Sequence, residues 1–237
     1  MGENKIRSIS LDDGRYFKKA FLRWEWMLVL LLIAVNVMNI AISPNYLNTK
    51  NLASTMKIFL DKGIVAITMT MVLLLGEIDI SVGSMMALSG TIMGLVGNAG
   101  GNFLEVALAG LLTGTLCGFF NGFLITRFTE LSSTIITLAN QIFFRGIALV
   151  ILENRAYAEF PAGVKFMSWG SVFNVPFILV FFLLEVIGIT YLVHFTTFGR
   201  SLFAMGRNIK ASYYSGVKTD QIKIAVFTMN GMAASIS

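Results

Sequence analysis

The sequence predicts an all-α, polytopic membrane protein, a helical bundle of six full spans followed by the start of a seventh. Three observations favour this fold class. Hydrophobic residues make up 56% of the 237 residues and charged residues only 13%, a more apolar balance than water-soluble domains need. The apolar residues form runs of about 20, the length at which a helix crosses a bilayer. The basic residues cluster beside such runs, as at the cytoplasmic ends of membrane spans.

Residues 1–24 form the first basic stretch and are expected to lie in the cytoplasm, ahead of a transmembrane domain over residues 25–237. Their basic residues are Lys5, Arg7, Arg15, Lys18, Lys19 and Arg23. The apolar run Trp26–Ile42 is longer than the core of a signal peptide, and Pro44 stands where cleavage would occur. We therefore expect this run to be an uncleaved first span.

Three further runs are clear spans: Leu104–Thr126, Leu131–Leu152 and Val172–His194. The apolar stretch Gly63–Gly97 is too long for one span, and Glu77 and Asp79 interrupt its middle. It is predicted to form two short spans, Gly63–Gly76 and Val82–Gly97. A last apolar run extends from Ile224 to Ser237 and supplies the start of the seventh span.

Charge then orients the spans. With the N-terminus in the cytoplasm, six crossings return the chain there after His194, so residues 195–223 form a basic cytoplasmic loop, as the positive-inside rule requires. The loop Glu153–Ser171 falls outside with mixed charges. Three lysines also fall outside, against the rule: Lys50, Lys57 and Lys62.

The interruption at Glu77, Asp79 and Ser81 is the first functional candidate, because a carboxylate at membrane depth is costly. Gly76 permits local unwinding, and Asp79 and Ser81 are good helix N-caps. One interpretation is a capped helix junction at the cytoplasmic face with both acids in water, and this is favoured. The other is a broken helix that lines a substrate or gating site.

A second group of polar residues lies within the later spans, at Asn121, Asn140, Gln141 and Arg145. Because they cannot all face lipid, we expect Asn140, Gln141 and Arg145 to form a polar strip toward the bundle interior. Alternatively, Arg145 snorkels or pairs with a distant acid. Together with the first group, these residues are the candidates for the translocation pathway or its gating.

Glycines recur every four residues along one predicted span, at Gly110, Gly114, Gly118 and Gly122. Gly90 and Gly94 repeat the spacing in the preceding span. Such a stripe lets another helix backbone approach closely in lipid. Close helix packing is favoured over direct contact with a substrate.

The cytoplasmic loop carries signals of a short helix. Asn208 is a good N-cap, Ile209–Ser215 can form two turns, and Gly216 suits the left-handed position at the end. A capped helix outside the membrane has the shape that docks into a groove on another protein. The alternative is an amphipathic helix resting on lipid head groups.

No motif of enzyme chemistry is visible. The sequence has no Gly-x-x-x-x-Gly-Lys-Ser/Thr loop, so this chain is not expected to bind ATP in that way. One cysteine, Cys117, and one histidine, His194, make a His/Cys metal site unexpected. We expect no enzymatic activity, no cofactor, no metal site and no nucleic-acid partner.

Several motifs occur together in order: Gly76–Ser84, Phe119–Gly122, Thr137–Ala139, Arg145–Gly146, Phe198–Asn208, Ala211, Ser215–Val217 and Asn230–Gly231. This set resembles the permease subunits of bacterial carbohydrate ABC importers of the ribose, rhamnose and autoinducer-2 group. With a glutamate at position 77, the Gly76–Ser84 motif is most similar to that of the rhamnose-type permeases.

The resemblance implies a permease of the bacterial inner membrane that translocates a monosaccharide or related small carbohydrate. It implies an identical or homologous second permease and a periplasmic sugar-binding protein. ATPase subunits carrying ATP and Mg would bind the coupling loop 195–223. The coupling residues are expected to be Gly199, Arg200, Ala204, Gly206, Arg207, Asn208, Ala211, Ser215 and Gly216.

Two other functions are considered. An ion-coupled secondary transporter would need an ion or proton site, for which Glu77 and Asp79 are the candidates. A non-transporting membrane assembly protein or fragment is suggested by the end of the chain at Ser237, since relatives are expected to continue by several spans.

Overall fold

The computed structural model describes residues 24–43, 46–153, 155, 160–172 and 175–237. The predicted cytoplasmic segment 1–24 therefore lies outside the described residues, apart from Trp24. The chain divides into two compact units, residues 1–52 and 53–237. The first contains helix α2 (Trp24–Ile42), most of whose large apolar side chains are exposed, as in a helix surrounded by lipid.

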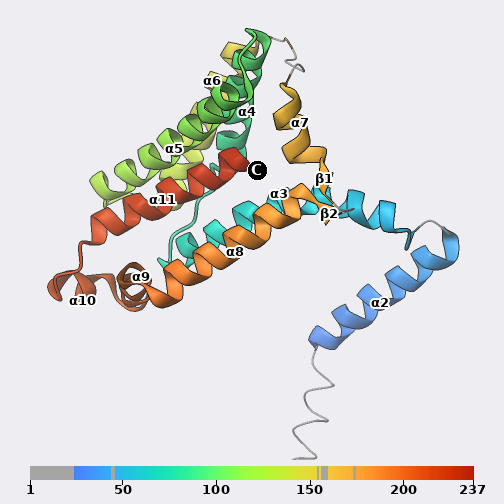
Figure 1. Cartoon of the computed structure of the whole chain (residues 1–237). Helices are drawn as coiled ribbons and strands as arrows, with labels where there is room; N and C mark the ends of the chain where they lie inside the picture. Colours follow the sequence, from blue (N-terminus) through green and yellow to red (C-terminus); the bar gives the residue numbers. More distant parts are fainter. Residues whose placement is uncertain (1–23, 44–45, 154, 156–159, 173–174) are drawn as a thin grey trace, which may run out of the picture. The chain divides into compact units, whose positions relative to one another are not determined.

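The second unit is a bundle of helices (Figure 1). Its long helices are α3 (Thr49–Leu74), which begins just before the unit boundary, α4 (Val82–Asn98), α5 (Phe103–Arg127), α6 (Ser133–Leu152), α8 (Phe177–Phe195) and α11 (Thr219–Ile236). Shorter elements are α7 (Ala162–Trp169), α9 (Thr197–Arg207), α10 (Ile209–Tyr214) and an antiparallel pair of two-residue strands, β1 (Ser171–Val172) and β2 (Val175–Pro176).

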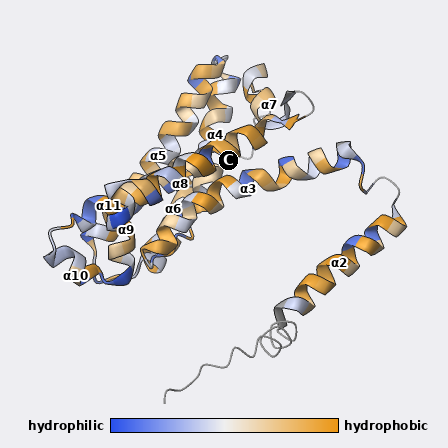
Figure 2. Ribbon diagram, turned by 60° about the horizontal axis from the view of Figure 1, so that its bottom comes forward, coloured by the Kyte–Doolittle hydropathy of each residue, from blue (hydrophilic) through white to orange (hydrophobic). Residues whose placement is uncertain are grey.

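The all-α, multi-pass fold is confirmed. Among the described residues, α5, α6 and α8 are long and apolar enough to cross a membrane, and α2 and α4 contain shorter apolar stretches. Helices α2, α3, α4, α5, α6 and α8 correspond to the six predicted spans, and α11 to the seventh. Figure 2 shows hydrophobic residues along most of α2 and α8, which suits helices whose outer faces meet lipid.

Two predicted boundaries were wrong. Helix α3 begins at Thr49 rather than Gly63, because a polar first half continues the apolar half in one helix of 26 residues. In that polar half, the Lys57 ammonium donates a 2.5 Å hydrogen bond to the Trp169 carbonyl. Helix α8 begins at Phe177 rather than Val172, because Val172 and Val175 pair in the two short strands and Pro176 takes the N-cap position.

Helix α11 lies side by side with α5, and this is the most extensive helix contact in the bundle. The stripe on α5 makes the approach possible, since a Cβ on Gly114 or Gly118 would collide with backbone atoms of Gly231. Gly122 lies against the backbone of Ile224 in the same way. The missing Cβ atoms of these glycines let the two backbones approach closely.

The other predicted packing glycines behave differently. Gly110 lies against the side chain of Met93 on α4, and Gly94 is buried. Gly90 is exposed, and a Cβ there would meet nothing within 4 Å. The packing role predicted for Gly90 is therefore wrong, because Gly90 faces the open cavity between α4, α5, α7 and α11 rather than a helix backbone.

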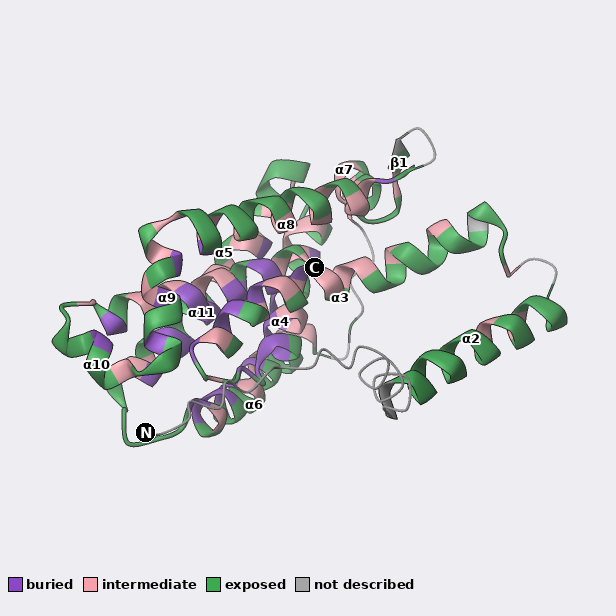
Figure 3. Cartoon of the chain, turned by 90° about the horizontal axis from the view of Figure 1, so that it is seen from below, coloured by how far each residue is buried: buried purple, intermediate pink, exposed green. Residues whose placement is uncertain are grey.

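Figure 3 shows that buried residues concentrate where α4, α9 and α11 meet their neighbours. One buried cluster joins the end of α3 to α9 and α11 through Met71, Leu202 and Phe227. A second joins α4, α5, α6 and α11 around Met85 and Phe144. The first cluster therefore contains buried residues of α3, before the interruption, and the second contains buried residues of α4, after it.

Candidate functional site

The segment between α3 and α4 is a break with a defined beginning. Gly76 adopts φ +75°, which favours glycine. Its N–H donates to the Leu73 carbonyl at 2.9 Å, and the Glu77 N–H donates to Val72 at 3.2 Å. This pair of bonds is a Schellman motif, which ends α3 and turns the chain into the non-helical residues that follow.

Helix α6 supplies hydrogen bonds to the extended part of the break. The Ile78 N–H donates to the Ser133 hydroxyl oxygen at 3.2 Å, and the Ile80 N–H donates to Thr137 Oγ1 at 3.2 Å. Unpaired backbone N–H groups are costly at membrane depth. Ser133 and Thr137 therefore hold the broken backbone in place.

Asp79 lies at the centre of the break and is only 3% exposed. Its Oδ1 accepts from the Ser81 N–H at 2.9 Å and from the Ser81 hydroxyl at 2.7 Å. Its Oδ2 accepts from the Asn230 side-chain amide on α11 at 3.0 Å. The carboxylate is therefore fully engaged by protein groups, and the interpretation that places it in water is wrong.

The hydrogen bonds continue from Asp79 in two directions. The Asn121 amide on α5 donates to the Ser81 hydroxyl oxygen at 2.7 Å, and the Asn140 amide on α6 donates to Asn121 Oδ1 at 2.7 Å. On the other side, the Thr68 hydroxyl on α3 donates to Asn230 Oδ1 at 3.1 Å. We call the six residues the polar network: Thr68, Asp79, Ser81, Asn121, Asn140 and Asn230.

The polar network joins α3, α5, α6 and α11 to the break, and each of its members is buried. Four of the predicted pathway residues are thus brought together: Asp79, Ser81, Asn121 and Asn140. Ser81 occupies the predicted N-cap position of α4, but its side chain makes no capping bond. Its hydroxyl bonds to Asp79 instead.

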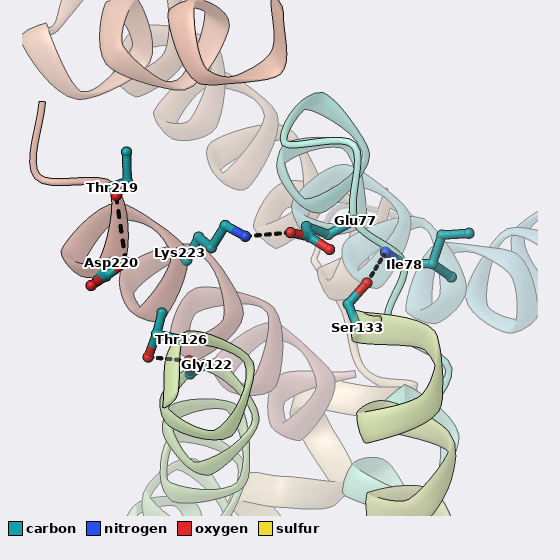
Figure 4. Close-up of polar contacts among 8 residues, drawn as sticks. All are labelled: Glu77, Ile78, Gly122, Thr126, Ser133, Thr219, Asp220 and Lys223. Atoms are coloured by element: carbon teal, nitrogen blue, oxygen red, sulfur yellow. Dashed lines mark hydrogen bonds and ion pairs between the residues drawn. The ribbon is translucent and has the colours of Figure 1, made fainter. Parts of the chain in front are cut away.

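Glu77 makes a separate contact with α11, shown in Figure 4. Its carboxylate pairs with the Lys223 ammonium at 2.5 Å, and the side chains are 16% and 17% exposed, respectively. The pair lies at the edge of the bundle, whereas Asp79 lies inside it. The prediction that Glu77 is surrounded by water is therefore also wrong.

The predicted polar strip on α6 is wrong for Arg145. Asn140 is buried, but Arg145 is exposed on another face of the helix. Phe144 is four positions from Asn140 and shares its buried face, whereas Arg145, five positions away, lies about 140° around the helix from it. Gln141 is half-buried, and its Oε1 has no hydrogen-bond partner among the described residues.

The loop 195–223 folds into α9 and α10, which we call the coupling element. Leu202 and Met205 bury one face of α9 against the end of α3. Two glycines permit close approach: a Cβ on Gly199 would collide with the Val193 backbone, and one on Gly206 with the Leu74 carbonyl. The coupling element is therefore attached where the break begins.

The predicted caps of α10 are confirmed. The Ala211 N–H donates to the Asn208 side-chain oxygen at 3.0 Å, and Gly216 has φ +86°. The opposite surface of the coupling element is exposed and largely basic or aromatic. It presents Arg200, Ala204, Arg207, Asn208, Lys210, Ala211, Tyr213, Tyr214 and Ser215.

Some residues of the site were not predicted. Thr68 and Lys223 gave no signal by themselves, although Asn230 stood in a motif. Glu185 lies in the middle of α8, and its Oε2 is buried without a partner in the described part of the chain. A lone acid in an apolar span was a visible signal.

The larger cavities lie elsewhere in the second unit. One of about 530 Å³ is lined by α4, α5, α7 and α11, including Met93, Leu108 and Ser235. No member of the polar network lines it. The network is thus a packed interior contact rather than the wall of this cavity.

A multi-pass helical bundle, a broken membrane helix and an amphipathic element outside the spans are features of membrane transport proteins. The chain belongs to the family described as branched-chain amino acid transport system / permease component, whose model matches residues 51–237. The resemblance to importer permeases is confirmed by this match, and the chain is a multi-pass membrane protein of that transport family.

Several curated relatives are similar to this chain. The autoinducer 2 import system permease protein LsrC of Yersinia pseudotuberculosis serotype O:3 (strain YPIII) is 34% identical over 174 residues, which cover 73% of this chain and 49% of the relative. LsrC of Yersinia pestis (strain Pestoides F) is 33% identical over the same shares. The chain therefore spans about half the length of these relatives. No solved structure matches it.

Proposed function

We propose that this chain is a permease subunit of an ABC importer in the bacterial inner membrane and that it translocates a small carbohydrate. ATP and Mg would be bound and used by partner ATPase subunits, and no chemical step would occur in this chain. The observation that carries the proposal is the family match over residues 51–237. Membership of a permease family favours a transporter over an enzyme.

The coupling element supports the assignment of an ATPase partner. Its exposed surface joins Arg200 and Arg207 on α9 to Tyr213 and Tyr214 on α10. Arginine and tyrosine are enriched among the residues that dominate protein interfaces. The opposite face is buried against the membrane helices, so a partner that moves this element also moves the end of α3.

Autoinducer-2 is the favoured substrate, because the curated relatives are autoinducer-2 import permeases. Rhamnose and ribose are less favoured substrates; the glutamate at position 77 was the reason to consider rhamnose. Glu77 pairs with Lys223, so its presence has a packing reason that does not depend on the sugar. A second permease, identical or homologous, and a periplasmic binding protein complete the proposed importer, with the N-terminus of this chain in the cytoplasm.

The secondary-transporter alternative is not favoured. Its two candidate ion ligands are Glu77 and Asp79, and both are already bound by groups of the protein. A free ion would have to displace Lys223 from one and the hydrogen bonds of Ser81 and Asn230 from the other.

Uptake measurements test the proposal. We would co-express the chain with the ATPase, the second permease and the binding protein, and measure ATP-dependent uptake of labelled autoinducer-2, rhamnose and ribose. The double variant Arg200→Glu/Arg207→Glu should lose the ATPase on purification. Lys165→Glu, an exposed lysine on α7, is the matched control and should retain it.

The other outcomes separate the alternatives. Uptake that continues without ATPase and is abolished by a protonophore would show a secondary transporter. Failure to recover any ATPase with the wild-type chain would favour a non-transporting assembly protein. Uptake of rhamnose or ribose in preference to autoinducer-2 would correct the substrate alone.

A further inference from the structure

Helix α11 holds the break at two points. Lys223 pairs with Glu77, and Asn230 donates to Asp79. Lys223 and Asn230 lie two turns apart and so share one face of α11. Glu77 and Asp79 lie two residues apart in the break, and the side chains of both contact α11. The two contacts are therefore parallel links between the same two elements.

The two links differ in burial. Asp79 is 3% exposed and accepts three hydrogen bonds, so releasing it would strand several buried polar groups. Glu77 and Lys223 form one ion pair at the bundle edge. Opening this pair breaks one contact, so it leaves fewer buried polar groups without a partner than release of Asp79 would and separates at a lower cost.

The edge pair also lies beside the coupling element. Lys223 is in the second turn of α11, and only residues 215–218 separate this helix from α10. On the other side, Gly206 of α9 touches the carbonyl of Leu74, at the end of α3. The start of the break is therefore held between two parts of the chain that a coupling partner would move.

We infer that the Glu77–Lys223 pair is the releasable link through which movement of the coupling element reaches the broken helix, while Asp79–Asn230 is the fixed anchor. Glu77 and Lys223 act as positioning residues: they set where the break lies relative to α11. The role in transport rests on the proposed function, but the release of the break by opening the pair does not.

Hydrogen exchange tests the link without transport. The amides of Gly76, Glu77, Ile78 and Ile80 are all hydrogen-bonded, so exchange reports opening of the break. In the full chain in lipid nanodiscs, Lys223→Met should speed their exchange about five- to thirtyfold. Lys165→Met removes an exposed lysine on α7 and should leave it unchanged. Equal exchange in the two variants would overturn the inference.

Charge exchange tests the role in coupling. In the assembled importer, Glu77→Lys and Lys223→Glu should each lower the solute transported per ATP hydrolysed by about tenfold. The double variant Glu77→Lys/Lys223→Glu restores an ion pair and should recover most of the ratio. A merely structural role would change the amount of protein and not this ratio. A double variant as impaired as either single variant, or single variants with the wild-type ratio, would overturn the role in coupling.

The two measurements also separate this inference from the proposed function. A complex that neither hydrolyses ATP nor takes up solute would contradict the importer assignment. The exchange rates of Lys223→Met would then still decide whether the pair holds the break.

Discussion

The Asn230 amide donates a 3.0 Å hydrogen bond to the Asp79 carboxylate, across 151 residues of sequence. The same amide group accepts from the Thr68 hydroxyl, so one asparagine on α11 bonds both to α3 and to the break that follows it. A broken membrane helix exposes backbone and acid groups that lipid cannot satisfy. Here α6 bonds to the backbone of the break and α11 and Ser81 bond to its acid, which explains how an acidic break persists in an apolar bundle.

Removing the Asp79 carboxylate should destabilise the bundle. Asp79→Ala leaves the Ser81 N–H, the Ser81 hydroxyl and the Asn230 amide without their acceptor. Because each stranded buried group costs about 1–3 kcal/mol, we expect a loss of about 3 kcal/mol or more in the free energy of unfolding. Asp79→Asn keeps one carbonyl oxygen and should lose less. Unfolding in mixed detergent micelles measures both, with exposed Glu130→Ala as the control.

Asn121 and Asn140 should behave as a coupled pair, since their side chains are 2.7 Å apart and buried. We expect Asn121→Ala and Asn140→Ala each to destabilise the chain, and the double variant to cost less than the sum. A coupling energy of about 0.5–3 kcal/mol is expected for such contacts. Strictly additive losses in a double-mutant cycle would show that the bond contributes nothing.

Two glycines should respond oppositely to alanine. At Gly118 a Cβ would meet the Phe227 carbonyl and the Gly231 backbone, so Gly118→Ala should push α11 from α5 and cost about 1–3 kcal/mol. At Gly90 the space is open, and Gly90→Ala should gain about 0.5–1 kcal/mol from helix propensity. Melting temperatures of the two variants in one detergent test this. An unchanged melting temperature for Gly118→Ala would contradict the close α5–α11 contact, and a loss for Gly90→Ala would contradict the open space there.

The N-cap bond of α10 should make a measurable contribution to the local stability of the coupling element. Asn208→Ala removes the acceptor of the Ala211 N–H and should cost about 1 kcal/mol of local stability. Asn208→Asp keeps an oxygen at that position and serves as the matched variant. Hydrogen exchange at Ala211 is the readout, and it should be faster in Asn208→Ala than in either Asn208→Asp or the unaltered chain.

Local signals predicted local features well. The ends of α10 follow from Asn208 and Gly216, because a side-chain cap and a left-handed residue depend on neighbours within a few positions. Interruption of the Gly63–Gly97 stretch was likewise visible from its acids. The start of α3 was not, because a helix can continue past the apolar residues that mark its span.

Partners across the bundle were beyond sequence reasoning. Lys223 and Glu77 are 146 residues apart, and Thr68 and Asn230 are 162 apart. Nothing in either local sequence states which helix faces the other. The prediction that Arg145 faces the bundle interior was wrong for the same reason. The helical period shows which residues share a face, but the packing of α6 against α4 and α5 decides which face is inside.

The sequence by itself determined that this is a multi-pass helical membrane protein, that the apolar stretch Gly63–Gly97 is broken at its acids, and which residues cap α10. These properties depend on composition and on near neighbours. Only the tertiary structure decided that the acids of the break face α11, that Asp79 is buried while Glu77 lies at the edge, and that Gly118 packs closely while Gly90 does not. These features depend on which helix faces pack against one another. In lipid, that packing is determined by close contacts and polar pairs rather than by hydrophobicity.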